Sequence, residues 1–517
     1  MSDKPTMHGG GESYSGVVPA KQPNKGGRPS AEVVEERPLA KENTEQSNQC
    51  RTQSRESGPN GLGRVREVAK KDGEVRFTAL LHHVTVDLLR DSYHSLKKKA
   101  APGVDGVTWR EYGEGLEARI SDLHGRIQRG AYQAQPSRRV WIPKSDGRKR
   151  PLGIAALEDK VVQHAVGKVL NQIWEEDFLG FSYVRNGPAT GDSGRGAVNR
   201  GPRWFRGALD ALSVGIVRKK VNWVLDLDVR SFFDKVDHQW LVKFVEHRIA
   251  DQRIIRLIQK WLKAGVMEDG RWFETEEGTP QGSVISPSLA NLYLHYVLDL
   301  WVQAWRKKVA RGEVIAVRYA DDAVLGFQYR EDAERFLKQL RERMGKFGLE
   351  LHPEKTRLIE FGRYAAERRA KREEGKPETF NVLGFTHICG TSHKTGYFTV
   401  HRKTIGKRMA AKLKDIHAKL RQRMHEKIRG TLEWLQAVVR GYFLYHAIPG
   451  NEERLKAFLH EVRRSWLRTL RRRSQRTRWT WERFMERLGV LLPAVAIQHP
   501  YPTERFDAKH PRQEPCA

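Results

Sequence analysis

The chain has 517 residues, and its 93 Lys and Arg against 63 Asp and Glu give a formal net charge of +30. This excess is unlike the balance of a small-molecule enzyme and indicates a polyanionic partner, with a basic but merely solvated surface as the alternative. Three widely spaced cysteines exclude a disulfide framework and a zinc site made of cysteine pairs. Since no apolar run approaches the roughly 18 residues of a membrane helix, we expect a soluble cytoplasmic protein with no membrane partner.

The first half of the chain begins without any apolar periodicity. Residues 1–75 are rich in Gly, Pro, Ser, Glu and Lys, which predicts a disordered leader. Residues 138–154 indicate two short strands joined by a Lys-Ser-Asp-Gly turn, and an apolar stripe predicts a helix at 157–174. Residues 184–207 are rich in Gly, Arg and Asn and have no period, so we expect a loop there.

The second half alternates strands and helices and then becomes wholly helical. VNWVLDLDV at 221–229 is typical of a strand, and 239–263 of two helices that break near Ala250. A long helix is predicted to begin with Ser286 as its N-cap and proline in its first turn. The remaining expected elements are a helix at 331–347, strands near 356–361 and 380–387, and helices from about 403 to 490.

Two adjacent acids interrupt an apolar hairpin in VRYADDAVLGF, residues 317–327. Two Asp residues in a turn usually reflect turn chemistry alone. Here both flanks look like strands buried on both faces, so the charges would be costly without a cation, and Mg²⁺ prefers such oxygens. A two-metal site needs a further acid from another strand. Asp226 and Asp228 share one face of the strand at 221–229, and we expect one of them to be structural.

Three segments then carry a resemblance. DVRSFFD at 228–234, TPQG at 279–282 and YADD at 319–322 occur in the order of the palm motifs of reverse transcriptases. The chain resembles the reverse transcriptase/maturase encoded by bacterial group II introns, over roughly residues 78–505. The other matching segments are 103–107, 142–144, 150–154, 383–385 and 441–443.

The resemblance implies an α+β fold, a right-hand polymerase with fingers and palm of the reverse-transcriptase type and an all-helical thumb. It places the fingers at 76–220, the palm with the catalytic carboxylates at 221–395, a helical thumb or maturase (X) domain at 396–490 and a short tail at 491–517. The implied partners are group II intron RNA, a DNA primer or target, and deoxynucleoside triphosphates. The oligomeric state stays open, with a dimer as one option.

The resemblance also implies a catalytic metal site. Asp228 and Asp321 would hold two Mg²⁺ ions, Asp322 would support them, and Val229 would lend a backbone carbonyl. Phe233 matches a steric gate whose ring would clash with a 2′-hydroxyl and so select deoxynucleotides. The pattern alone leaves a core phenylalanine equally open.

Further residues match the nucleotide and primer contacts of the family. Lys144 and Arg150 would meet the triphosphate, although a solvated basic turn is the alternative. Gln281 would lie along the incoming nucleotide, and Lys355 matches a lysine proposed to donate a proton to pyrophosphate. The expected primer grip is Leu383, Gly384 and Phe385, where glycine lets the backbone approach the strand.

The helical region is predicted to bind RNA through one face. Residues 451–476 combine an apolar stripe with an Arg-rich outer face, which suits a duplex held by its phosphates or intron RNA, although a solvated face is the alternative. The expected RNA contacts are Arg463, Arg464, Arg468, Arg471, Arg472 and Arg473.

Two departures from the family pattern leave a second function open. Residues 184–207 replace a shorter segment that helps shape the template and nucleotide pocket, which favours a polymerase-impaired, RNA-binding splicing factor as the alternative. The chain also ends shortly after residue 502, so we expect no C-terminal HNH endonuclease. An RNA-copying RNA polymerase is disfavoured by the bulky ring of Phe233.

Overall fold

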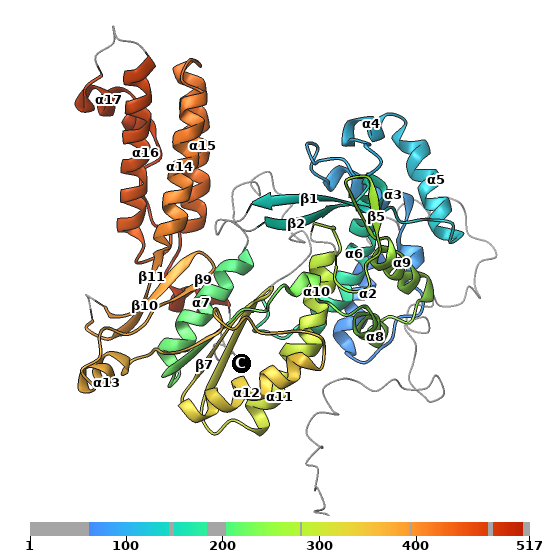
Figure 1. Cartoon of the computed structure of the whole chain (residues 1–517), viewed down its shortest axis with the longest axis horizontal. Helices are drawn as coiled ribbons and strands as arrows, with labels where there is room; N and C mark the ends of the chain where they lie inside the picture. Colours follow the sequence, from blue (N-terminus) through green and yellow to red (C-terminus); the bar gives the residue numbers. More distant parts are fainter. Residues whose placement is uncertain are drawn as a thin grey trace, which may run out of the picture. The chain divides into compact units, whose positions relative to one another are not determined.

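The computed structural model describes residues 61–143, 149–183, 203–279, 282–392, 395–473 and 479–509, with the side chains of 203–205 and 507–509 excepted (Figure 1). The chain divides into two compact units. The first unit comprises residues up to Pro188 with Val229–Val309 and Lys338–His352, and the second comprises the rest. Within the described ranges, no helix is both long and apolar enough to cross a membrane.

The first unit contains a four-stranded sheet in the order β2-β1-β4-β5. β1 (Ser137–Pro143) and β2 (Lys149–Ile154) are antiparallel, which confirms the predicted pair of strands. β4 (Val266–Glu268) lies parallel to β1 and pairs with β5 (Arg271–Phe273). These last two strands were not predicted, because segments of three residues are too short to show alternation.

Helices form most of the first unit, with α6 (Leu157–Asp177) buried along most of its length. The break predicted near Ala250 is confirmed, since α8 (His238–Arg248) ends before α9 (Gln252–Lys263) begins. The remaining elements are η2 (Leu81–His83), α3 (Val86–Ser95), α4 (Trp109–Gly113), α5 (Leu116–Gln128), η4 (Phe232–Asp234), α10 (Ser286–Leu294), η5 (His295–Asp299) and α11 (Leu300–Lys308).

The start of the folded chain and one helix cap differ from the sequence predictions. Residues 61–71, assigned to the disordered leader, form α2 (Gly61–Lys71), which buries Val65 and Ala69 and contacts α6. Arg66 Nε donates to Glu176 Oε1 of α6 at 2.7 Å. The N-cap of α10 is Ile285, and Ser286 is instead the buried first helical residue, with proline following it as predicted.

The second unit is built on the sheet β6-β7-β3-β8. Its strands are β3 (Trp223–Leu227), β6 (Val314–Tyr319), β7 (Asp322–Phe327) and β8 (Arg357–Glu360). The residues of β6 and β7 are buried almost throughout, as expected for strands covered on both faces. α7 (Arg203–Arg218) packs against β6, and Figure 1 shows it beside this sheet. The ring of Phe336 in α12 (Arg330–Gly345) packs on that of Phe327.

A second, three-stranded sheet has the order β11-β10-β9. The single strand predicted at 380–387 is wrong, because β9 (Phe380–Val382) and β10 (Phe385–Thr391) are separated by two residues with positive φ, Leu383 and Gly384. β11 (Phe398–Thr404) was not predicted, since its sequence FTVHRKT is largely polar. The helical region therefore begins at residue 406 and not near 403.

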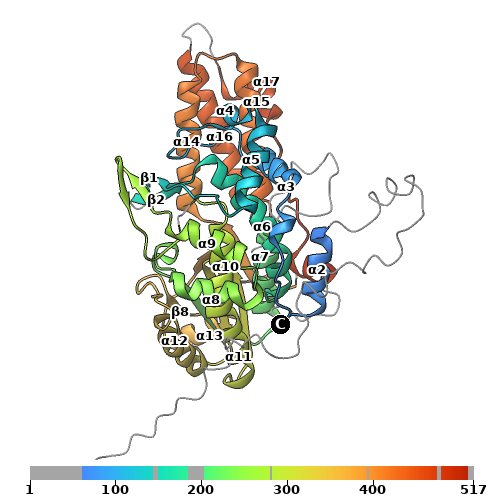
Figure 2. The ribbon, with the colours of Figure 1, turned by 90° about the vertical axis from the view of Figure 1, so that its right-hand side faces the viewer.

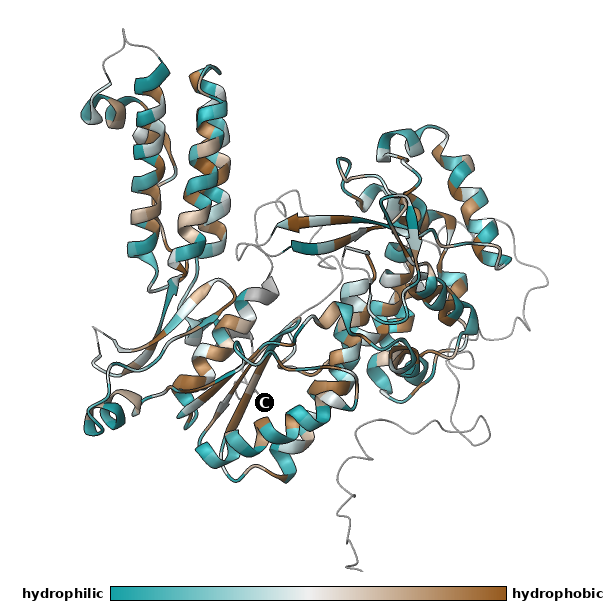
Figure 3. Cartoon of the chain, viewed as in Figure 1, coloured by the Kyte–Doolittle hydropathy of each residue, from teal (hydrophilic) through white to brown (hydrophobic). Residues whose placement is uncertain are grey.

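Three long helices follow, α14 (Gly406–Gln422), α15 (Ile428–His446) and α16 (Glu452–Arg473), side by side in both views (Figures 1 and 2). Figure 3 shows apolar residues alternating with polar ones along them, as expected for helices that bury one face. Leu455, Phe458 and Trp466 belong to their shared core. The shorter helices of this unit are α13 (Ala365–Lys371), α17 (Trp481–Arg487), η6 (Gly489–Leu491) and α18 (Pro502–Lys509).

The start of the second unit is tied to its end by a buried ion cluster. Asp210 of α7 is 2% exposed and accepts a hydrogen bond from Arg402 of β11 at 3.4 Å. Arg505 of α18 donates a second, short hydrogen bond to the same carboxylate. One acid thus joins three segments that are far apart in the sequence, because a buried carboxylate needs such partners.

Candidate active site

The acids predicted to bind metal lie at one end of the sheet of the second unit, where β3 and β6 end and β7 begins. β3 pairs antiparallel with β7 in a register that sets Asp226 opposite Val324 and Leu227 opposite Ala323. The next step of this register sets Asp228 opposite Asp322, and directly opposite residues share one face of a sheet. The strand and the hairpin tip therefore bring these carboxylates to one end of the sheet, as the sequence predicted.

A two-residue turn connects β6 to β7 at this end. Tyr319 pairs with Asp322, so Ala320 and Asp321 form the turn itself. Ala320 has φ 56°, in the left-handed region that residues other than glycine rarely adopt. Asp321 is partly buried, whereas the side chain of Asp322 keeps access to solvent. Both acids can therefore be reached by a ligand from solution.

The carboxylates repel one another. Partial loss of hydration and the negative charges of Asp321 and Asp228 together raise the pKa of Asp322 to about 6, against the opposing charges of Arg408 and Lys355. Burial likewise raises the pKa of Asp226 to about 6, with Asp322 and Asp228 adding to the effect and Arg357 opposing it. This mutual repulsion would be relieved by a cation, which is the electrostatic signature of a metal site.

The end of β3 is held by two residues that directly precede β8. Lys355 Nζ donates to Asp228 Oδ2 at 2.7 Å. Thr356 is buried, and its hydroxyl lies 3.3 Å from both the backbone nitrogen and the carbonyl oxygen of Asp228. The backbone of Asp228 is thereby fixed, while its carboxylate is paired with a cationic side chain that a solvent-exposed ligand can displace.

The side chains predicted to bind metal are all carboxylates, which are the ligands that hard divalent cations prefer. They also repel one another unless a positive charge lies between them. In the described parts of the chain, however, no three acidic, histidine or cysteine side chains converge closely enough to hold a metal ion. Lys355 takes up one oxygen of Asp228.

Comparison with known proteins decides the family. A model of the family described as reverse transcriptase (RNA-dependent DNA polymerase) matches residues 142–387. Protein YkfC of Escherichia coli (strain K12) is 36% identical over 288 residues, which are 50% of this chain and 72% of that protein. The chain belongs to the reverse transcriptase family. Members of this family generally use divalent metal ions, in line with the cluster of carboxylates.

Two further relatives of the reverse transcriptase come from introns. The group II intron-encoded protein LtrA of Lactococcus lactis subsp. cremoris is 30% identical over 301 residues, which are 57% of this chain but only 47% of LtrA. The putative COX1/OXI3 intron 1 protein of Saccharomyces cerevisiae is 27% identical over 230 residues, 44% of this chain and 26% of that protein. These relatives confirm the resemblance to group II intron reverse transcriptases, while the chain spans less than half of either intron protein.

The residues expected to grip a primer form the turn between β9 and β10 of the reverse transcriptase. Leu383 has φ 49° and Gly384 has φ 84°. The carbonyl of Leu383 accepts a hydrogen bond from the Tyr445 hydroxyl at 3.1 Å. Phe385 is fully buried and stacks with Tyr445, so its ring supports the turn from the core and cannot itself touch a primer. The primer grip stays a prediction, with the backbone of Leu383 and Gly384 as its turn.

The hairpin tip and this turn share a hydrophobic cluster in the second unit. Tyr319 packs with Leu383 and Tyr445 against a core of Leu209, Phe385 and Ile448. Tyr319, which precedes the acidic pair, thus rests on the same residues that hold the expected primer grip. Sequence reasoning missed Tyr445 and Arg408, because nothing in a regular helical pattern distinguishes them.

Phe233 and the expected metal ligand Val229 belong to the first unit, whereas Lys355 belongs to the second. Val229 follows Asp228 directly, is 6% exposed and bridges to Leu351. Phe233 lies in η4 and is only partly buried, whereas Phe232 beside it is the core ring, packed near Tyr293. The structure therefore gives no support to the alternative of a core phenylalanine at position 233.

Three more residues are expected to contact the nucleotide. Arg150 is exposed on β2, where it pairs with Ile142 of β1. Lys144 and Gln281 lie outside the described residues. Two glycines of the matching motifs mark close backbone packing in this unit: a Cβ on Gly282 would lie 2.8 Å from Gly153 O, and one on Gly103 would lie 2.5 Å from Ala156 Cα.

The arginines predicted to bind RNA differ in their surroundings. Arg463 is partly buried and its Nε donates to Gly489 O at 3.1 Å, so it helps hold the helices together. Arg464, Arg471 and Arg473 are exposed but each donates a hydrogen bond within the unit. Arg468 and Arg472 are exposed and, among the described residues, form no ion pair or hydrogen bond. These two are the best placed for an external anion.

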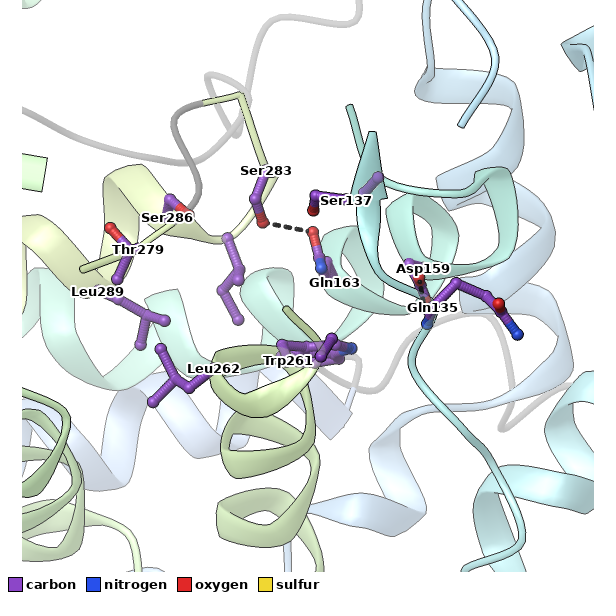
Figure 4. Close-up of a pocket in the computed structure, with 13 residues that line it drawn as sticks. Gln135, Ser137, Asp159, Gln163, Trp261, Leu262, Thr279, Ser283, Ser286 and Leu289 are labelled. Atoms are coloured by element: carbon purple, nitrogen blue, oxygen red, sulfur yellow. Dashed lines mark hydrogen bonds between the residues drawn. The ribbon is translucent and has the colours of Figure 1, made fainter. Parts of the chain in front are cut away.

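A small cavity in the first unit has a different character. Ser283 Oγ donates to Gln163 Oε1 at 2.7 Å across it, and Asp159 lies on its wall (Figure 4). Burial raises the pKa of Asp159 to about 6. The enclosed volume is about 10 Å³, room for a single water molecule and far too little for a nucleotide.

Proposed function

We propose that the protein is an RNA-directed DNA polymerase that also acts as the maturase of a group II intron, in which it extends a DNA primer on intron RNA. The observation that carries this proposal is the meeting of Asp228 with the acidic hairpin tip at one end of the sheet. Two further facts support it: the family match, and the similarity to LtrA, a group II intron-encoded protein.

The catalytic acids would be Asp228, Asp321 and Asp322, with the carbonyl of Val229 as a further ligand. They would hold two Mg²⁺ ions, which when bound activate the primer 3′-hydroxyl and neutralise charge on the triphosphate and leaving pyrophosphate. Thr356 would keep the Asp228 backbone in place, as its two contacts with that residue indicate.

Further residues would recognise the incoming deoxynucleotide. Arg150 and Lys144 would bind the triphosphate, Gln281 would lie along the nucleotide, and Phe233 would exclude a 2′-hydroxyl. Lys355 would leave Asp228 as cations arrive and would then give a proton to pyrophosphate. The partial exposure of Phe233 and the solvent access of Lys355 support these roles.

The chain would work as a right-handed polymerase. Fingers at 76–220, a palm at 221–395 and a helical thumb at 396–490 would hold the template and primer, and a maturase surface on α16 would bind intron RNA. The net charge of +30 and the exposed arginines of α16 support binding to phosphates. Deoxynucleoside triphosphates, intron RNA and a DNA primer or target would be the partners.

Primer extension on an RNA template with deoxynucleotides and Mg²⁺ tests the proposal. Wild type should extend the primer, and Asp321→Ala should lower the rate at least about a thousand-fold, because a metal ligand is lost. Asp122→Ala removes an exposed carboxylate of α5 and serves as the matched control. Normal extension by Asp321→Ala would refute the assignment of the site.

The alternative is a splicing factor whose polymerase pocket is impaired. The observation in its favour is the segment 184–207, which departs from the family pattern and lies largely outside the described residues. An intron RNA splicing assay on the same preparations separates the two functions. Accelerated splicing without any primer extension by the wild type would leave only the splicing factor.

A further inference from the structure

The turn that carries the catalytic acids contains a strained residue. Ala320 has φ 56° in a two-residue hairpin loop, where glycine, asparagine or aspartate is usual because of the positive φ. A side chain at Cβ makes this conformation unfavourable, so it persists only where neighbouring groups enforce it. Ala320 directly precedes Asp321, and its carbonyl belongs to the peptide unit that joins the two residues.

A buried arginine contacts this turn. Arg318 is 1% exposed, and its Nη1 donates to Ala320 O at 3.0 Å. It ends the otherwise apolar run of β6 from 314 to 317, and the small Ala323 lies opposite it on β7. Burying a guanidinium is unfavourable unless it is hydrogen-bonded, so an apolar residue would serve packing alone better at this position.

We propose that Arg318 is a positioning residue that holds the Ala320 peptide in its left-handed conformation and thereby sets the directions of the Asp321 and Asp322 carboxylates. The hydrogen bond fixes the orientation of the Ala320 carbonyl, and with it the peptide plane from which Asp321 starts. This inference rests on the proposed polymerase function for its kinetic consequence. The geometry of the turn does not depend on that function.

Combined replacement of Arg318 and Ala320 distinguishes a positioning role of the arginine from a purely structural one. If Arg318 acts through the strained alanine, a glycine at position 320 should make the arginine partly dispensable, since glycine adopts positive φ without a Cβ clash. A purely structural arginine would show no such dependence, because its loss would weaken the core whichever residue occupies the turn. A double-mutant cycle measures this coupling directly.

The experiment compares four variants of the full chain with wild type: Arg318→Met, Arg318→Lys, Ala320→Gly, and Arg318→Met with Ala320→Gly. Calorimetric titration with Mg²⁺ reports on the acids without requiring catalysis, and primer extension at saturating nucleotide reports on the reaction. Melting temperature shows whether each variant folds. Arg318→Lys covers the case in which Arg318→Met does not fold, because lysine can still donate one hydrogen bond.

We expect Arg318→Met to weaken Mg²⁺ binding and to slow primer extension by roughly ten-fold each. An effect of this size corresponds to the free energy stored in one strained residue. Arg318→Lys should fall between Arg318→Met and wild type. Adding Ala320→Gly to Arg318→Met should restore both quantities at least about three-fold, although Ala320→Gly alone should not improve on wild type.

Two results would overturn the inference. The first is a double variant no better than Arg318→Met in Mg²⁺ binding. The second is a fall in melting temperature with unchanged Mg²⁺ binding in Arg318→Met and Arg318→Lys. Failure of wild type to extend primers would count against the proposed function alone. The titration would still decide the role of Arg318.

Discussion

At the scale of single residues, Lys355 would compete with a bound cation for one oxygen of Asp228. Lys355 Nζ lies 2.7 Å from Asp228 Oδ2, and both side chains keep contact with solvent. Such an exposed pair contributes little stability, so it can exchange readily. The ammonium group of Lys355 neutralises the Asp228 carboxylate when no cation is bound. The same positive charge would weaken the binding of a divalent cation.

Replacing Lys355 by Met should therefore separate metal binding from catalysis. Removal of the competing charge should tighten Mg²⁺ binding by roughly two- to five-fold, as expected for a partly exposed ion pair. Primer extension should nevertheless become slower, because the proposed proton donor to pyrophosphate is lost. Calorimetric titration and single-turnover extension measure the two effects. Lys403→Met is the matched control, since Lys403 pairs with an exposed Glu453 at 3.0 Å; weaker Mg²⁺ binding in Lys355→Met would contradict the competition.

His387 of β10 makes the fold sensitive to acid. It is fully buried and stacks on Phe380, and burial, with the charge of Arg402, lowers its pKa to about 3. The unfolded chain takes up a proton near pH 6.5 while the folded chain does not. The folded state therefore loses stability as pH falls below 6.5, and the loss continues toward pH 3.

The variant His387→Phe should reduce this acid sensitivity. Between pH 7.5 and 5.0 the free energy of unfolding should drop by about 2 kcal/mol less than in wild type, the contribution of one such histidine. Urea denaturation at both pH values measures the difference. Replacement of the exposed His425 by Phe is the control and should leave the pH dependence unchanged. Equal losses in His387→Phe and wild type would show that the residue titrates in the folded state.

At the scale of elements, the strands that carry the candidate catalytic acids could be predicted, whereas the residues that support these strands could not. β3 and the β6–β7 hairpin follow apolar patterns that place Asp228 and the acidic pair at strand ends, and the pairing register agrees. The turn at Leu383 and Gly384 was missed because backbone conformation leaves no periodic signal. Arg318 was also missed, although a charged residue inside an apolar strand was a visible hint.

Gly384 offers a test of the expected primer grip. A Cβ at this position would lie 3.3 Å from the Tyr445 ring and 3.4 Å from Arg408. Gly384→Ala should lower the free energy of unfolding by about 1 kcal/mol, because φ is positive, and should also slow primer extension. Gly396→Ala is matched in φ, at 69° against 84°, but its Cβ would meet no atom within 4 Å.

The two glycine variants are best compared side by side. Gly396→Ala should lose similar stability in urea denaturation and keep its rate of primer extension. Equal rates for both variants, with equal stabilities, would show that the turn between β9 and β10 does not contact the primer. Binding of the primer–template duplex, measured by fluorescence anisotropy, locates any defect in the grip itself.

At the scale of the whole molecule, only part of the excess positive charge is free to bind an external anion. The net charge of +30 predicts a polyanionic partner, but Arg463, Arg471 and Arg473 of α16 donate hydrogen bonds to backbone carbonyls of the protein itself. Sequence patterns cannot distinguish these cases, because an arginine that donates to a backbone carbonyl and one that faces solvent occupy the same helical spacing. Arg468 and Arg472 remain exposed.

Replacing Arg468 and Arg472 together by Gln should weaken RNA binding and its dependence on salt. Loss of two phosphate contacts should lower the slope of log K against log salt concentration by between about one and two. Filter binding at several salt concentrations gives the slope. Arg463→Gln is the control: it should lower thermal stability through its lost bond to Gly489 and leave the slope unchanged. An unchanged slope in the double variant would remove α16 from the RNA surface.

The carboxylate of Asp210 also bears on how the protein can be shortened for study. Its partners Arg402 and Arg505 come from a strand and from the terminal helix α18, so a version trimmed before residue 502 loses one of the two guanidinium groups and uncovers the flank of α7. Affinity tags and protease sites are therefore better joined beyond residue 509 than in place of α18. Fragments that omit this helix should be insoluble or prone to aggregate.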